Sequence, residues 1–138
     1  MVVLLIIMAF FFSAACSTGD PRIGVEGAQA VLSPMIIGSA SVFLLIENTG
    51  KGSDSLVEAR VDFPGSVTEL HAIEDGKMRK TPSIDIPAKS VVRLKPTGEH
   101  IMIYRLPRDI KIGARGALTL VFKKSGQITT PFQFSNTL

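Results

Sequence analysis

The stretch Val91–Leu106, VVRLKPTGEHIMIYRL, contains two β-rich runs separated by the turn sequence PTG. Its second run, HIMIY, alternates so that His100, Met102 and Tyr104 fall on one face of a strand and two isoleucines fall on the other. The isoleucine face is predicted to pack into a core, while the opposite face presents an imidazole and a thioether. This stretch therefore predicts a strand with one apolar face and one face rich in potential ligands.

The same pattern of short runs rich in Val, Ile, Phe and Thr continues along the chain from Ile23 onward, with Gly, Pro, Asn, Asp and Ser clusters between the runs. The Asp75-Gly76 pair is of the kind that permits a tight hairpin with positive φ, which favours antiparallel connections. Pro87 and Pro107 are predicted to mark strand ends or edges, because proline lacks a ladder donor. Nine strands are expected, which indicates a sandwich or barrel: Ile23–Leu32, Ser39–Asn48, Ser55–Phe63, Val67–Glu74, Lys77–Lys80, Ser90–Pro96, His100–Leu106, Ala117–Lys123 and Ile128–Phe134.

Length and composition fit one globular domain. The chain has 138 residues, 46% of them hydrophobic and 20% charged, and its single cysteine cannot form an internal disulfide. Its net charge is +3, yet no run of five or more basic residues occurs and acidic residues are interspersed throughout. The sequence therefore does not predict nucleic-acid binding, and the cluster Lys77, Arg79 and Lys80 is expected to be a solvated face.

The N-terminus differs from the rest of the chain. Residues 1–12 are wholly apolar and SAAC follows, which is typical of a signal peptide and too short for a transmembrane helix. Small residues before Cys16 partly match a bacterial lipobox, so residues 1–15 are predicted to be a lipoprotein-type signal peptide, cleaved before a lipidated Cys16. Residues 16–22 would then be a linker and residues 23–138 the functional domain. Simple secretion and a retained anchor are the alternatives, and each places the domain outside the cytoplasm.

Common enzyme signatures are missing from the sequence. There is no nucleophile elbow, no phosphate-cradling glycine loop, no C-x-x-C and no H-E-x-x-H. Carboxylates such as Glu69, Glu74 and Asp75 are scattered and are expected to be solvated. The chain is therefore predicted not to be an enzyme.

A set of neutral donors remains: His71, Met78, His100 and Met102. An imidazole and a thioether two residues apart on one strand face can converge on one ion, and this soft donor set favours copper(I) over zinc, iron or manganese. Taken singly, each residue also fits a structural role: a surface or hydrogen-bonded histidine, an exposed hairpin methionine, or a core-filling methionine. H-x-M alone is a weak motif, and it gains weight only with the other residues.

The sequence resembles the periplasmic copper(I) chaperones of the PCuAC type. The resemblance is carried by Phe43–Phe63, Val67–His71, the stretch from Ile84 through Val91–Leu106, and Ala117–Phe132. In that family the metal motif is a histidine, often followed directly by methionine, then a further methionine, then 21 residues and His-x-Met. Here residues 79–99 separate Met78 from His100-Ile-Met102, which is 21 positions.

This resemblance implies an all-β fold, a single-domain, cupredoxin-like antiparallel β-sandwich with Greek-key connections. It also implies one Cu(I) per chain, held at an exposed site by His71, Met78, His100 and Met102. The copper would be delivered to the dinuclear copper centre of cytochrome c oxidase or to another cuproprotein or copper chaperone. The chain is expected to be monomeric and to contact the membrane only through a possible lipid anchor. This chain differs from the family pattern in two ways. Ala72 stands where many members have methionine, and six residues separate His71 from Met78 where the family usually has about ten.

Two other hypotheses stay open at this point. The chain could be a metal-free extracytoplasmic adhesion or assembly module that shares only the sandwich, because fold does not fix function. It could also be a copper redox protein, although a blue-copper centre needs a cysteine and the single Cys16 lies in the predicted processing region.

Overall fold

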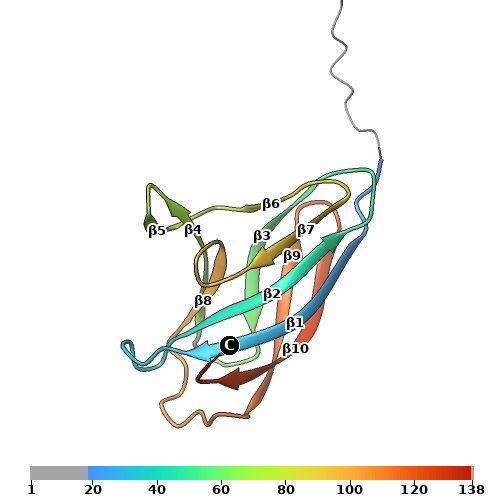
Figure 1. Cartoon of the computed structure of the whole chain (residues 1–138). Helices are drawn as coiled ribbons and strands as arrows, with labels where there is room; N and C mark the ends of the chain where they lie inside the picture. The colour runs from blue at the N-terminus through green and yellow to red at the C-terminus, as the bar shows by residue number, and fades with distance from the viewer. Residues whose placement is uncertain (1–18, 138) are drawn as a thin grey trace, which may run out of the picture.

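Ten β-strands and their connecting loops make up the part of the chain that the computed structural model describes, residues 19–137 (Figure 1). Nine of the strands lie where the sequence predicts them. The additional strand covers three residues between two predicted strands. The strands are β1 (Ile23–Leu32), β2 (Ala40–Asn48), β3 (Asp54–Val61), β4 (Val67–Glu74), β5 (Lys77–Lys80), β6 (Ile84–Ile86), β7 (Ser90–Leu94), β8 (His100–Tyr104), β9 (Arg115–Phe122) and β10 (Gly126–Ser135).

Hydrogen bonds connect the strands in the order β5-β4-β8-β2-β1-β10-β9-β3-β6. Strand β2 changes partner along its length, because Ala40–Val42 pair with β8 and Leu44–Asn48 pair with β7. Strand β3, near one end of this order, contacts β4, near the other end, and the Thr68 hydroxyl of β4 donates to the Ala59 carbonyl of β3. The sheet therefore curls over on itself into two layers around one core, as the predicted β-sandwich requires.

One pairing departs from the predicted antiparallel pattern. β1 and β10 run parallel, with Gln29 opposite Gln133, whereas every other paired strand is antiparallel among the described residues. Turn residues cannot reveal this pairing, because β1 and β10 lie at opposite ends of the described chain and no hairpin joins them.

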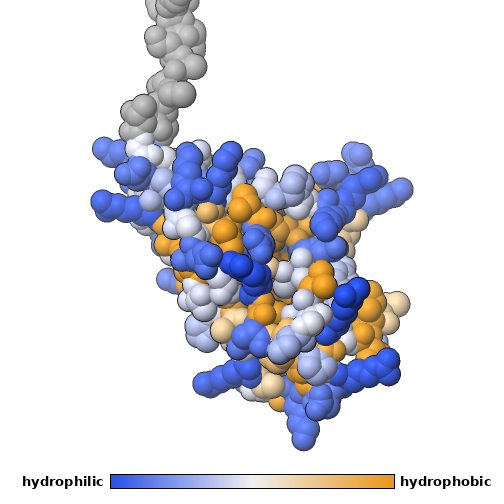
Figure 2. Space-filling model, turned by 180° about the vertical axis from the view of Figure 1, so that it is seen from behind, coloured by the Kyte–Doolittle hydropathy of each residue, from blue (hydrophilic) through white to orange (hydrophobic). Residues whose placement is uncertain are grey.

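The core lies between the two layers and follows the alternation of the strands. Ile101 and Ile103 are fully buried, which confirms the predicted apolar face of β8. Phe63, Phe132 and Phe134 add an aromatic cluster in which the Phe132 and Phe134 rings meet edge to face with centroids 5.1 Å apart. The outer surface is mixed, and Figure 2 shows hydrophobic side chains exposed among hydrophilic ones.

Two predicted turn features are confirmed. Asp75 and Gly76 have φ angles of 50° and 71° in the turn between β4 and β5, as a two-residue hairpin of the predicted kind requires. Pro87 follows the last residue of β6, in agreement with its predicted place at a strand end.

The described N-terminal residues are fixed against the loop after β2. The Arg22 amide donates to the Asn48 side chain at 3.1 Å, and the Thr49 amide donates to the Arg22 carbonyl at 2.9 Å. Asn48 is itself fully buried and also donates to the Gly52 carbonyl at 2.8 Å. The predicted signal peptide and Cys16 lie outside the described residues. Within residues 19–137 no helix has the length and apolarity needed to cross a bilayer.

Candidate metal site

The two histidines of the chain lie directly opposite each other on neighbouring strands. His71 of β4 pairs with His100 of β8 in the antiparallel register, and their ring centroids are 5.5 Å apart with the planes at 63°. Opposed residues of an antiparallel pair point to the same face, so both imidazoles lie on the outer face of β8. His71 is 8% exposed and His100 is 1% exposed, so the two rings sit together in a nearly dry environment.

Each imidazole uses one nitrogen for a protein hydrogen bond and leaves the other without a partner. His100 Nδ1 is 2.9 Å from the Gly98 carbonyl oxygen, and His71 Nε2 is 3.1 Å from a Glu69 carboxylate oxygen. Both oxygens are acceptors, so these two nitrogens carry the protons. The remaining nitrogens, His71 Nδ1 and His100 Nε2, each keep a lone pair, and both atoms are buried without a hydrogen-bond partner. Buried polar atoms are normally satisfied, so this pair points to a ligand that the protein itself does not supply.

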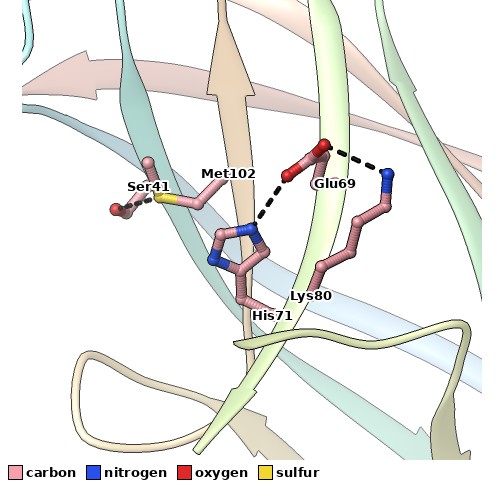
Figure 3. A network of polar contacts seen from close by, with 5 residues as sticks. All are labelled: Ser41, Glu69, His71, Lys80 and Met102. Carbon is pink, nitrogen blue, oxygen red and sulfur yellow. Dashed lines mark hydrogen bonds and ion pairs between the residues drawn. The ribbon is translucent and has the colours of Figure 1, made fainter. Parts of the chain in front are cut away.

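Met102 contributes a sulfur on the same face. It lies two residues from His100 on β8, opposite Ser41 of β2 and Glu69 of β4, and it is 6% exposed. The Ser41 hydroxyl lies 3.0 Å from the Met102 sulfur and donates a hydrogen bond to it (Figure 3). A thioether has two lone pairs, so this contact orients the sulfur and leaves one lone pair for a soft metal.

Met78 lies on the next strand and is far more accessible. It belongs to β5, opposite Ile73, whereas Lys80 is the residue opposite His71. Met78 is thus a diagonal neighbour of His71 on the same face, and such neighbours have Cα atoms about 7 Å apart. Its side chain is 53% exposed. The sheet therefore brings together three of the four predicted donors and keeps Met78 at the solvent side.

Burial of the site differs from the expectation of an exposed site. His71, His100 and Met102 are all buried. The Phe43 ring, itself buried, lies 6.1 Å from the His100 ring. Strand alternation places the donors on one face, but it does not show that an aromatic residue from β2 shields that face.

Glu69 also departs from its sequence-based interpretation. The sequence predicts a solvated carboxylate, but the Glu69 side chain is only 26% exposed. It lies between His71 and Lys80, with Lys80 Nζ 3.1 Å from its second oxygen (Figure 3). The two hydrogen bonds hold the pKa of the Glu69 carboxyl below its usual value. Its position two residues before His71 on a predicted strand could have identified it, since the two side chains must share a face. No local pattern marks Ser41 or the Gly98 carbonyl.

The electrostatic environment keeps the second histidine neutral. Burial lowers the pKa of the His100 imidazole, and this effect exceeds the opposing influence of its hydrogen bond to Gly98. A proton on the neighbouring His71 ring would lower that pKa further. Burial, together with the negative charge of Glu69, raises the pKa of Tyr104. A neutral imidazole with an available lone pair is the form that binds a metal.

The donor set is of the soft, uncharged kind. Among residues 19–137, no group of three or more His, Cys, Asp or Glu side chains is arranged to hold a metal ion. The arrangement found instead, two imidazole nitrogens with a thioether beside them, suits monovalent copper.

Comparison with solved structures places the fold. The chain superimposes on the copper-bound PCuAC domain from PmoF2 with a TM-score of 0.69 and 22% identity, covering 83% of this chain and 93% of that domain. It superimposes on CuI-DR1885 from Deinococcus radiodurans with a TM-score of 0.69 and 19% identity, covering 90% of this chain and 80% of that protein. These similarities confirm the predicted cupredoxin-like β-sandwich.

Sequence comparison gives the family. The chain is 30% identical over 115 residues to "Putative lipoprotein Lxx21020" of Leifsonia xyli subsp. xyli, covering 80% of this chain and 69% of that protein. Residues 23–134 match the family described as "Putative lipoprotein LpqE-like". The matched region contains all ten strands up to Phe134 of β10, including every residue of the site. The chain therefore belongs to the LpqE-like family.

Proposed function

We propose that this chain is an extracytoplasmic copper chaperone of the PCuAC type that carries one Cu(I) per molecule. His71 Nδ1, His100 Nε2 and the Met102 sulfur bind the ion, and Met78 completes the site from the β4–β5 hairpin. The observation that supports this proposal most directly is the pair of buried imidazole nitrogens without hydrogen-bond partners. The solved PCuAC domains of the same fold, one of them copper-bound, lend further support.

The burial of the three inner donors and the exposure of Met78 suggest how the ion moves. Two neutral imidazoles and a thioether add no charge to compensate, so a monovalent ion is easier to accommodate than a divalent one. Met78, on the solvent side, is the donor that dissociates from the ion most easily, which leaves the three buried donors to be exchanged for ligands of the partner. Ligand exchange then proceeds one donor at a time, and the chain acts as a carrier and not as an enzyme.

The destination and location are part of the same proposal. The acceptor is the dinuclear copper centre of cytochrome c oxidase or another extracytoplasmic copper protein. Membership of a lipoprotein family supports lipid attachment at Cys16 after removal of residues 1–15. The domain then works on the outer side of the membrane as a monomer.

An anaerobic titration with Cu(I) against a coloured copper(I) chelator tests the site. The unaltered chain should bind one equivalent, and X-ray absorption should count nitrogen and sulfur neighbours in equal numbers. Met102→Leu and His71→Asn should each weaken binding strongly, and Met78→Leu should weaken it less. Met35→Leu is the matched control, because Met35 is 89% exposed in a loop outside the site. Full-strength binding by both the Met102 and His71 variants would refute the assignment.

A further inference from the structure

An apolar loop projects from the domain between β1 and β2. Met35, Ile36 and Ile37 are consecutive and are 89%, 53% and 79% exposed, and no charged residue occurs from Ser33 to Ser39. The loop has a defined conformation, because the Ser33 hydroxyl accepts hydrogen bonds from the Met35 and Ile36 amides at 3.3 and 3.1 Å. Soluble domains rarely hold three adjacent large apolar side chains in water without a binding partner.

A basic loop lies against the apolar one. Residues 105–114, between β8 and β9, carry the exposed cations Arg105, Arg108 and Lys111 against a single acidic residue, Asp109. The Leu106 amide donates to the Gly38 carbonyl at 2.8 Å, which joins the two loops. We call residues 33–39 and 105–114 together the apolar–basic end. Figure 2 shows hydrophobic side chains protruding between hydrophilic ones at the lower right edge, where the β1–β2 loop of Figure 1 lies after the rotation.

This end adjoins the metal site through two of its strands. The apolar loop leads into β2, whose second residue is Ser41, and the Ser41 hydroxyl contacts the Met102 sulfur. The basic loop leaves β8 at Arg105, three residues after Met102. A protein bound at this end therefore lies about 10 Å from Met102 along β8.

The apolar–basic end also lies far from the point where the chain enters the domain. β1 has ten residues from Ile23 to Leu32, which corresponds to about 33 Å of strand. The described residues 19–22 precede β1 at its opposite end, where Arg22 bonds to Asn48 and Thr49 (Figure 1). A lipid anchor at Cys16 is seven residues from Ile23 and reaches at most about 25 Å, so it holds the other end of the domain toward the membrane.

We propose that the apolar–basic end is the docking surface for the copper acceptor, and that the acceptor is a protein with an apolar patch rimmed by acidic side chains. This proposal rests on the proposed function, since it assumes that the site holds transferable copper. Apolar contact provides the binding energy, and the net positive charge of the basic loop steers an acidic partner toward the Met102 side of the site.

The test measures the second-order rate of Cu(I) transfer from the loaded chain to the copper-free soluble domain of a cytochrome c oxidase copper subunit. The chain carries Cys16→Ser so that no lipid is attached. The variant Ile36→Ser/Ile37→Ser should transfer at least about tenfold more slowly with unchanged copper affinity. Val91→Ser is its control, because Val91 is also well exposed, at 60%, but lies on β7.

A second pair of variants tests whether the positive charge of the basic loop speeds copper transfer. Arg108→Glu/Lys111→Glu should slow transfer about tenfold at low salt, and the difference should shrink as ionic strength approaches about 0.5 M, where charges are strongly screened. Lys89→Glu/Lys123→Glu makes the same charge change at the opposite end and should leave the rate unchanged.

Equal transfer rates in both loop variants and the unaltered chain overturn the docking surface. Absence of transfer from the unaltered chain overturns it as well. The proposal also fails if the chain binds phosphatidylglycerol vesicles and this binding depends on Ile36 and Ile37, because the face would then be a membrane contact. None of these results affects the copper titration, so failure of the docking surface and failure of the copper site are distinguishable.

Discussion

Replacing His100 by leucine should abolish copper binding without destabilising the copper-free protein. His100 is 1% exposed, and its Nε2 atom is buried without a hydrogen-bond partner. Leaving such an atom unsatisfied costs about 1–3 kcal/mol, whereas the bond from Nδ1 to the Gly98 carbonyl contributes only about 0.5–1.5 kcal/mol. Leucine is of similar size, so the free energy of unfolding should stay equal or rise by about 1 kcal/mol.

The assay is denaturant and thermal unfolding of the purified protein with and without Cu(I). For a domain of this size, about 1 kcal/mol corresponds to a rise of about 4 °C in Tm. Copper bound only by the native state should raise the Tm of the unaltered chain, and this response should be absent in His100→Leu.

A control on the other face of the same strand separates stability from binding. Ile103 is fully buried, and Ile103→Val should lower the free energy of unfolding by about 1 kcal/mol while the copper response stays intact. A fall of more than about 2 kcal/mol in the free energy of unfolding of His100→Leu would contradict this prediction, since the imidazole would then be a structural residue. A rise in the Tm of His100→Leu on addition of copper would contradict it as well.

Three further predictions concern residues around the site and the fold. Glu69→Ala should weaken Cu(I) binding by about 10- to 100-fold in the chelator competition, because the Glu69 carboxylate orients the His71 imidazole. Glu58→Ala, an exposed control on β3, should leave the copper affinity unchanged. Ser41→Ala removes a hydrogen bond worth about 0.5–1.5 kcal/mol to the methionine sulfur and should weaken Cu(I) binding by about 2- to 12-fold; unchanged or tighter binding would show that the hydroxyl must be displaced by the metal. The free energy of unfolding of the copper-free chain should fall as the pH drops below about 6.5. Burial lowers the pKa of His100, so the unfolded chain takes up a proton there that the folded chain does not. In His100→Leu, the denaturant midpoint should no longer show this part of the pH dependence.

Local patterns predicted the strands well because they depend on side-chain alternation and turn chemistry. The HIMIY alternation placed two isoleucines in the core, and Asp75-Gly76 formed the expected tight turn. Strand β6 was missed because Ile84–Ile86 offers only three residues, too few to show a period. The parallel pairing of β1 with β10 depends on the global curl of the sheet, which no short segment encodes.

The candidate histidines and methionines could be selected from the sequence, but their surroundings could not. Spacing and family resemblance selected the histidines and methionines, and the register of β4 against β8 places the two imidazoles opposite each other. Shielding by Phe43 and the hydroxyl contact from Ser41 come from β2, more than 50 residues earlier in the chain than Met102. Such contacts arise only when strands distant in sequence pair, so they required the three-dimensional structure.

The hairpin that carries Met78 has a geometric property that bears on how such proteins diverge. Its two strands pair residue for residue around the Asp75-Gly76 turn. Lengthening or trimming it by one residue from each strand leaves every side chain on its original side, whereas a single insertion in one strand turns the methionine away from the histidines. Natural relatives and engineered variants should therefore tolerate even-numbered changes in the interval from His71 to Met78, and odd-numbered changes only where a bulge restores the parity.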